Sequence, residues 1–220
     1  MKMGLPEPGA CAFPVMPTRL AADLHKVAEA DFPSRFGHFR ILGFESRNGQ
    51  SVEEAVVLKM GDLGGDPPPL VRIHSQCLTG DVFHSLRCDC RAQLELSLAM
   101  IADEGRGLLI YEHKEGRGIG LLNKLRAYEL QDEGADTVEA NEKLGFAADL
   151  RSYELPARIL LYFGIRRVRL LSNNPDKIRA LERSGIKIVE RVPCQAEYCE
   201  TAENYLRTKK ERMGHLLEGF

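Results

Sequence analysis

The sequence predicts a mixed α/β fold in which an N-terminal group of antiparallel strands is joined to a half with alternating helices and strands. Before residue 90, alternating apolar and polar residues are separated by turn-rich segments, a pattern typical of strands. From residue 91, apolar residues recur at helical spacing, and these stretches alternate with short apolar runs. The 220 residues are 44% hydrophobic, which is enough to form a substantial core.

The first half contains the predicted antiparallel group. Residues 1–20 include four prolines and show little periodicity, so we expect an irregular extension there and one domain over residues 21–220. Strands are predicted at residues 39–44, 55–60 and 70–73. The segments SRNGQS and GDLGGDPPP would form the turns between them.

The second half alternates between the two kinds of element. Helices are predicted at residues 92–103, 119–130, 155–163 and 177–184, and strands at residues 107–111, 168–171 and 186–189. A charged helix is predicted at residues 204–217, where Tyr205, Leu206, Met213 and Leu217 form a candidate docking face.

Charge and hydropathy exclude some classes of protein. Lys and Arg total 30 against 32 Asp and Glu, so the net charge of −2 argues against a general nucleic-acid binder. The sequence contains neither an apolar run that would cross a bilayer nor the continuous apolar stretch of a secretory signal. We therefore expect a cytoplasmic protein without a membrane or nucleic-acid partner.

Three cysteines lie close together in the segment RIHSQCLTGDVFHSLRCDC. Cys88 and Cys90 flank one residue and could bind the same ion, to which Cys77 would return through a loop. Three thiolates without a nearby fourth cysteine suit a catalytic zinc site, in which water takes the open position. His74 or His84 could instead complete a four-ligand structural site, and the spacing leaves both alternatives open.

A glycine-rich turn follows the strand predicted at residues 107–111. In EGRGIGLLNK, Gly116 and Gly118 precede a helix, so backbone N–H groups and Arg117 could bind a phosphate. A dinucleotide fingerprint is excluded because its acidic residue, here Asp136, should end a second apolar strand, whereas the segment LQDEGAD that ends at Asp136 is polar.

Two further segments carry polar residues with alternative interpretations. Asp149 and Arg151 are two residues apart, so both could face one site, although these residues taken alone favour a surface ion pair. In LLSNNPDKI, Ser172 and the two asparagines could cap the helix in whose first turn Lys177 lies.

The motifs occur together in the order found in one enzyme family. RIHSQCLTGD, SLRCDCRAQL, EGRGIGLLNK, DTVEAN, LGFAADLRSY, LLSNNPDK and TKKERMGHLL resemble GTP cyclohydrolase II over roughly residues 30–217. The resemblance implies that family's fold and hydrolysis of GTP with opening of the guanine ring and release of formate and pyrophosphate, as the first step of riboflavin synthesis. It also implies a homodimer that uses catalytic zinc and magnesium bound to the triphosphate. A second enzymatic domain is not expected in a chain with so short an extension.

The resemblance assigns residues to three roles. It implies zinc binding by Cys77, Cys88 and Cys90, and chemistry by Tyr128, Asp149 and Arg151. Tyr128 would move a proton, Asp149 would act as general base, and Arg151 would be either a nucleophile towards the innermost phosphate or a phosphate clamp. The implied substrate-binding residues are Arg72, Ile73, His74, Ser75, Gln76, Gln93, Glu115, Gly116, Arg117, Thr137, Ser172 and Lys177.

Three positions depart from the family pattern and keep two alternatives open. Gln76 replaces an expected glutamate, Arg91 an expected glycine, and Ser172 an expected threonine. These changes are compatible with a paralogue that stops at the formylated intermediate or serves another pathway. A binding module that zinc merely stabilises is the alternative outside enzyme chemistry.

Overall fold

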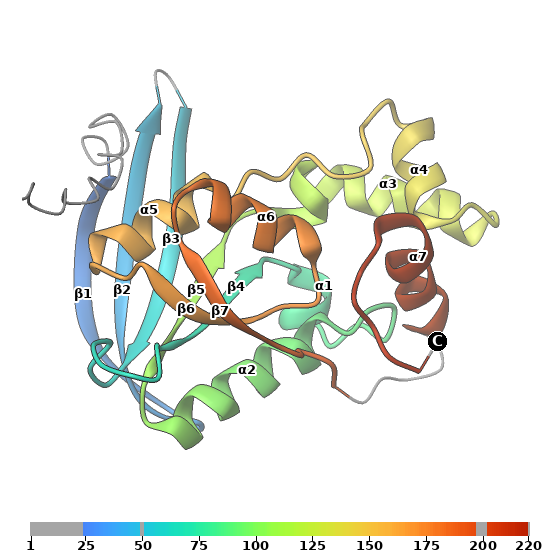
Figure 1. Cartoon of the computed structure of the whole chain (residues 1–220). Coiled ribbons are helices and arrows are strands. Elements are labelled where there is room, and N and C mark those ends of the chain that lie inside the picture. The colour runs from blue at the N-terminus through green and yellow to red at the C-terminus, as the bar shows by residue number, and fades with distance from the viewer. Residues whose placement is uncertain (1–23, 49–50, 197–201, 220) are drawn as a thin grey trace, which may run out of the picture.

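The first three strands form an antiparallel group at one edge of the sheet (Figure 1). The computed structural model describes residues 24–48, 51–196 and 202–219, so the expected extension at residues 1–20 lies outside it. β1 (Leu24–Ser34), β2 (Gly37–Asn48) and β3 (Ser51–Met60) pair in sequence order, and β3 continues antiparallel to β5 (Gly107–Glu112). The sequence predicted β2 and β3 but not β1, which is mostly exposed and carries charged side chains where a buried strand would be apolar.

The remaining strands are parallel. The full order is β1-β2-β3-β5-β4-β6-β7, with β4 (Leu70–Ser75) between β5 and β6 (Arg167–Leu171), and β7 (Lys187–Val192) beyond β6. The prediction that residues 70–73 belong to the antiparallel group is therefore wrong. Their side chains are buried, and a continuous buried run is typical of a parallel strand covered on both faces.

Helices cover both faces of this parallel half. α2 (Cys90–Glu104) packs on one face, while α5 (Glu154–Tyr162) and α6 (Pro175–Arg183) cover the other (Figure 1). Neighbouring strand residues contribute to opposite layers: Leu108 and Ile110 belong to the core beneath α5, and Leu109 belongs to the core beneath α2. These contacts fix the strands whose carboxyl ends form the floor of the site.

The other helices lie beyond those carboxyl ends. They are α1 (Leu78–Asp81), the 3₁₀ turn η2 (Glu115–Gly118), α3 (Leu121–Asp132), α4 (Thr137–Lys143) and α7 (Glu203–Met213). Figure 1 shows α3, α4 and α7 grouped to one side of the sheet. The sequence analysis missed α4, whose seven residues begin with a capping box between Asp136 and Glu139. The predicted helix at 204–217 ends earlier, because Gly214 adopts the left-handed conformation.

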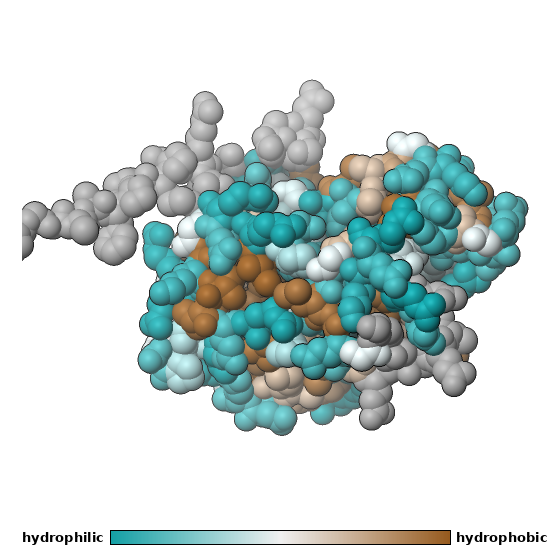
Figure 2. All heavy atoms as spheres, turned by 45° about the vertical axis from the view of Figure 1, so that its right-hand side comes forward, coloured by the Kyte–Doolittle hydropathy of each residue, from teal (hydrophilic) through white to brown (hydrophobic). Residues whose placement is uncertain are grey.

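Hydrophilic side chains dominate the face shown in Figure 2, and hydrophobic ones gather mainly in one area of it. Among the described residues, every helix is too short or too polar to cross a membrane.

Candidate active site

The three predicted metal ligands come together at the ends of α1 and α2. Cys77 precedes α1, Cys88 lies in the following turn, and Cys90 begins α2. Their sulfur atoms all lie within 4.8 Å of one another, with 3.7 Å between Cys77 Sγ and Cys88 Sγ. A Cβ added at Gly80 would lie 2.9 Å from Cys88 Sγ, so the close approach of α1 to the sulfur cluster requires glycine there.

Neither candidate histidine joins this cluster. His74 is buried, and its Nε2 lies 3.1 Å from Asp81 Oδ1. Burial lowers the pKa of His74, with Asp81 acting in the opposite direction. His84 is exposed, and the potential metal ligands that gather within the described residues are the three cysteines alone. The alternative of a three-cysteine, one-histidine site therefore finds no support in this geometry.

Asp81 holds the loop that carries Cys77. Its Oδ2 accepts hydrogen bonds from the Cys77 backbone N–H at 3.0 Å and from the Tyr111 hydroxyl at 2.8 Å. The Tyr111 ring stacks on His74, with ring centroids 5.4 Å apart. This buried network fixes the backbone at the first cysteine from the strands below it.

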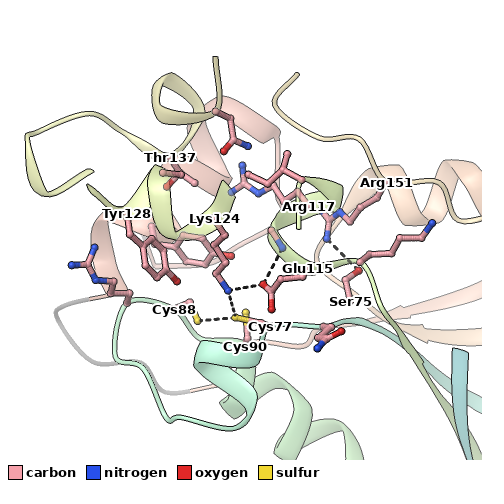
Figure 3. Close-up of a pocket in the computed structure, with 18 of the residues that line it drawn as sticks. Ser75, Cys77, Cys88, Cys90, Glu115, Arg117, Lys124, Tyr128, Thr137 and Arg151 are labelled. Carbon is pink, nitrogen blue, oxygen red and sulfur yellow. Dashed lines mark hydrogen bonds and ion pairs between the residues drawn. The ribbon is translucent and has the colours of Figure 1, made fainter. Parts of the chain in front are cut away.

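Lys124 is a residue in the site that the sequence analysis missed. It lies on α3, and its Nζ is 3.1 Å from Cys77 Sγ and 2.7 Å from Glu115 Oε1 (Figure 3). The other Glu115 oxygen accepts a hydrogen bond from the Leu78 backbone N–H at 2.7 Å. Hydrogen bonds from the Cys88 and Cys90 thiols, together with the Lys124 ammonium, lower the pKa of Cys77. Position 124 follows the glycine turn by one helical turn, which was the only sequence signal for it.

Tyr128 points into the same space. Its hydroxyl lies 3.2 Å from Thr79 Oγ1, and the Arg87 guanidinium carbon lies 4.8 Å from the centre of its ring. Figure 3 shows the ring beside Lys124 and above the cysteines. The ring therefore lines a cavity instead of packing within the hydrophobic core.

The glycine turn supplies the wall opposite. Gly116 and Arg117 adopt φ values of 59° and 61°. A Cβ on Gly116 would lie 2.9 Å from Ile119 Cγ1, so the turn requires glycine at that position. Arg117 Nη2 is buried and has no hydrogen-bond partner in the structure. A buried guanidinium donor without an acceptor is suited to an anionic ligand.

Asp149 and Arg151 form a partly buried pair in the extended segment before α5. Arg151 Nε donates to Asp149 Oδ1 at 2.9 Å, and Arg151 Nη2 donates to Asp149 Oδ2 at 2.5 Å. Burial would lower the pKa of Arg151, but Asp149 raises it above its ordinary value, while Arg151 lowers the pKa of Asp149 against the effect of burial. Arg151 Nη1 also reaches Ser75 Oγ at 3.3 Å. Each partner thus favours the charged form of the other, and Arg151 faces the site instead of the open surface.

These residues line two adjoining cavities. The first, here called the thiol cavity, contains the cysteine cluster and is lined by Ser75, Gln76, Cys77, Arg87, Cys88, Cys90, Lys114, Glu115, Gly116, Arg117, Ile119, Lys124, Ala127, Tyr128, Gln131, Thr137, Asn141, Arg151 and Tyr205. The second, here called the cationic cavity, is lined by Arg72, His74, Ser75, Cys90, Gln93, Arg117, Arg151, Ser172, Asn173, Asn174, Lys177, Tyr205, Lys209, Met213 and His215. Five residues belong to both, namely Ser75, Cys90, Arg117, Arg151 and Tyr205.

The cationic cavity has an unusual composition. Five Arg or Lys residues line it, and no carboxylate is found among its described lining residues. Lys177 is buried, and its Nζ donates to the Ile73 carbonyl at 2.8 Å. Burial, followed by the charges of Arg72 and Arg151, lowers the pKa of Lys177 well below its ordinary value. Such a concentration of cations is suited to a polyphosphate.

Most predicted substrate residues line one of these cavities, with informative exceptions. The Ile73 side chain lies in the core, so its backbone carbonyl is its contribution. Asp149, predicted to take part in the chemistry, lines neither cavity and instead pairs with Arg151. Asn174 caps α6, as one interpretation predicted, because its Oδ1 accepts from the Asp176 N–H at 2.8 Å. Helix α7 adds Tyr205, Lys209 and Met213 to the cationic cavity, and the segment after it adds His215; none of these was predicted to lie in the site.

The three departures from the family pattern also have definite places. Gln76 lines the thiol cavity, with Oε1 3.0 Å from His113 Nδ1. Arg91 lines neither cavity, because its guanidinium donates to the Asp81 carbonyl at 2.7 Å and pairs with Glu95 at 2.7 Å. Ser172 lines the cationic cavity and accepts from the Asn174 N–H at 3.1 Å.

Comparisons with known proteins agree with this geometry. Residues 25–193 match the family described as GTP cyclohydrolase II. "GTP cyclohydrolase-2" of Histophilus somni is 54% identical over 191 residues, which cover 87% of this chain and 88% of that protein. "GTP cyclohydrolase-2" of Escherichia coli K12 is 54% identical over 194 residues, 88% of this chain and 98% of that protein. "Riboflavin biosynthesis protein RibBA" of Chlorobium phaeovibrioides is 52% identical over 194 residues, 88% of this chain but 47% of that protein.

Proposed function

The chain belongs to the GTP cyclohydrolase II family, and we propose on this premise that it opens the guanine ring of GTP as the first step of riboflavin biosynthesis. The products would be formate, pyrophosphate and a ribosylamino-pyrimidinone phosphate. The observation that carries the proposal is the junction of a three-cysteine cavity with a cavity lined by five cations. A nucleoside triphosphate has the matching shape, with a base at one end and several negative charges at the other.

The cysteine cluster fits zinc. Two thiolates bound to one tetrahedral zinc ion at about 2.3 Å each lie about 3.8 Å apart, close to the 3.7 Å between Cys77 and Cys88. A set of sulfur ligands also favours zinc over magnesium or calcium, which prefer oxygen. Bound by Cys77, Cys88 and Cys90, zinc would supply Lewis-acid activation of a water for hydrolysis at the guanine ring.

The surrounding side chains would handle protons and orient the base. Tyr128 can donate a hydrogen bond or pass a proton, and because it lines the same cavity as the cysteines, it would do so beside the zinc at which we propose that the ring opens. Glu115 and Thr137 line the same cavity and can pair with the polar edge of guanine. Lys124 stabilises the negative charge of the Cys77 thiolate.

Arg151 acts as a phosphate clamp in this proposal. A nucleophilic role would require loss of a proton from a guanidinium whose pKa Asp149 raises. Asp149 accepts hydrogen bonds from Arg151 at both carboxylate oxygens, so its main role in this proposal is to orient Arg151. Asp149 could serve as a general base only after one of these hydrogen bonds is broken.

Magnesium would be carried by the substrate. The described lining of the cationic cavity offers no carboxylate to hold it, so the triphosphate oxygens themselves would bind the ion. Arg72, Arg117 and Lys177 would then neutralise the remaining charge as pyrophosphate leaves. A homodimer and a single domain over residues 21–220 complete the proposal, and light scattering of the purified protein tests the first of these.

Product analysis tests the function. Purified zinc-loaded protein is incubated with GTP and magnesium, and formate, pyrophosphate and the pyrimidine product are quantified. We expect all three in equal amounts. Pyrophosphate with a formylated product and no formate would identify the paralogue that stops early, which Gln76 in the thiol cavity keeps as a second candidate. Absence of all three, with unfolding on zinc removal, would favour the zinc-stabilised binding module.

A further inference from the structure

Lys209 lies in the middle of α7 and reaches the turn between two of the candidate metal ligands. Its Nζ is 2.8 Å from Oδ1 of Asp89, the single residue between Cys88 and Cys90. The side chains of Lys209 and Asp89 are only 10% and 5% exposed. An ion pair this deeply buried is sensitive to the loss of either partner, because the other charge would then be left without compensation.

The carboxylate of Asp89 does not cap α2, although the position of Asp89 would favour capping. Asp89 occupies the N-cap position of α2 but makes no side-chain capping hydrogen bond. Its Oδ1 faces Lys209, and its Oδ2 accepts from Gln93 Nε2 at 2.5 Å. One oxygen therefore ties the turn to α7 and the other to the side chain of Gln93 in α2, and neither caps the helix.

Lys209 also lines the cationic cavity, where direct binding of a phosphate would compete with its ion pair to Asp89. Its ammonium already faces Asp89 and lies 4.2 Å from the centre of the Tyr205 ring. Burial would lower the pKa of Lys209, whereas Asp89 and Tyr205 raise it, with a net increase. The charge of Lys209 is thus matched by Asp89 before any phosphate arrives.

Helix α7 is itself anchored on both sides of the site. Arg212 pairs with Asp136, the N-cap residue of α4, at 2.9 Å. Just after the helix, the Leu216 N–H donates to the Asn173 carbonyl at 2.8 Å. Leu206 is buried on the same helix. Lys209 therefore projects from a helix with fixed neighbours, as a positioning side chain requires.

We propose that Lys209 is a positioning residue of the metal centre: through Asp89 it holds the Cys88–Cys90 turn so that both sulfurs face Cys77. Helix α7, which follows the three cysteines by more than 100 residues, thereby becomes part of the metal site. The inference rests on the proposed function only in that the cluster binds zinc. Groups that orient metal ligands in this way typically affect metal affinity or activity by about 10- to 100-fold when they are replaced.

Zinc release to an excess of chromogenic chelator tests the proposal without GTP. Lys209→Met should release zinc about 10- to 100-fold faster than the wild type. Arg207→Met is the matched control, because it removes an exposed cation paired with Glu203 on the same helix, and should release zinc at the wild-type rate. Release from Lys209→Met at the wild-type rate would overturn the proposal.

A second variant shows whether Lys209 acts through Asp89. Asp89→Asn should release zinc faster as well, and the double variant should resemble the single ones because both changes break the same interaction. Additive effects would overturn the proposal. If Lys209→Met does not fold, as judged by circular dichroism, Asp89→Asn replaces it in the test. Faster zinc release from Asp89→Asn would then support the proposal, and release at the wild-type rate would overturn it.

Steady-state kinetics separates positioning from phosphate binding. We expect Lys209→Met, assayed with zinc in excess, to lower kcat more than it raises the KM for GTP. A raised KM with unchanged kcat and unchanged zinc release would make Lys209 a phosphate ligand and overturn the proposal. If wild-type protein does not turn over GTP while zinc release still depends on Lys209, the proposed function fails and the positioning role stands.

Discussion

The thiol cavity and the cationic cavity adjoin each other but differ in the chemistry of their walls. The thiol cavity combines three cysteines with Glu115, Tyr128 and other polar groups, whereas the cationic cavity gathers five cations and no carboxylate among its described lining residues. In the proposed function, the first would activate water and move protons, and the second would bind and neutralise phosphate. Ring opening and triphosphate binding would then be separable, with Arg117 and Arg151 among the residues that both cavities share.

Removal of a sulfur ligand should give the largest effect, and it should act on the thiol cavity, which all three cysteines line. Cys77→Ser, Cys88→Ser and Cys90→Ser should each abolish formate release, because each removes one thiolate from the same ion. Zinc content, measured by atomic emission, should fall with activity. Near wild-type formate release by any of these variants in metal-free buffer would contradict the assignment of the three cysteines as ligands of one catalytic ion.

Tyr128→Phe should remove a proton donor from the thiol cavity without removing a metal ligand. The ring is kept and the hydroxyl beside Thr79 is lost. Loss of a positioned proton donor typically costs about 10²- to 10⁴-fold in rate, so formate release should fall while GTP affinity is maintained. Formate and pyrophosphate are followed in parallel. Wild-type rates for both products would reduce Tyr128 to a packing role.

Arg151→Lys tests the junction between the cavities. The substitution keeps a charge but loses the two-point contact with Asp149 and the donor to Ser75. Turnover should fall by about 10- to 100-fold, in line with the loss of charge-assisted hydrogen bonds. Pyrophosphate release that slows but persists would exclude a covalent role for Arg151. Wild-type turnover would exclude the clamp as well.

Lys177→Met should affect the cationic cavity alone. The KM for GTP should rise about 10-fold, because a charge-assisted contact is lost, while zinc content stays constant. Because burial and the neighbouring arginines lower the pKa of Lys177, its ammonium loses the proton at a lower pH than an ordinary lysine. In the wild type, kcat/KM should therefore decline as pH rises through that lowered pKa, and this decline should disappear in Lys177→Met. Identical pH profiles would contradict the assignment.

Arg91→Ala should have the smallest effect. Arg91 departs from the family pattern but lines neither cavity, since its guanidinium bonds Asp81 and Glu95. Partly exposed pairs of this kind contribute about 0.2–1 kcal/mol, so turnover should stay within about twofold of wild type and the melting temperature should change little. A large change in GTP turnover would contradict the finding that Arg91 lies outside the thiol cavity.

The sequence predicted the helices of the second half better than the sheet. Helices α2, α3, α5 and α6 follow apolar residues at helical spacing, so their positions are encoded locally. The direction in which β4 pairs is not, because it depends on the crossover through α2. β1 was missed since it is exposed, and α4 since it is short, although its capping box at Asp136 and Glu139 was a usable signal.

The candidate site shows the same limit. Motifs identified the cysteines, the glycine turn, and the pair of Asp149 and Arg151, because each lies within a short segment. Lys124 and Lys209 were missed because their roles arise from contacts with residues 47 and 120 positions away. No local pattern marks a lysine as buried beside a particular thiol or carboxylate.

The separation of the two cavities is tested most directly by the binding of inorganic triphosphate to zinc-loaded and zinc-stripped protein, measured by titration calorimetry. The ligand has no base, so it reports on the cationic cavity alone. We expect the dissociation constants of triphosphate for zinc-loaded and zinc-stripped protein to agree within about threefold, or roughly 0.65 kcal/mol. Only the zinc-loaded protein should release formate from GTP. Loss of triphosphate binding in zinc-stripped protein that remains folded would contradict the separation of the two cavities.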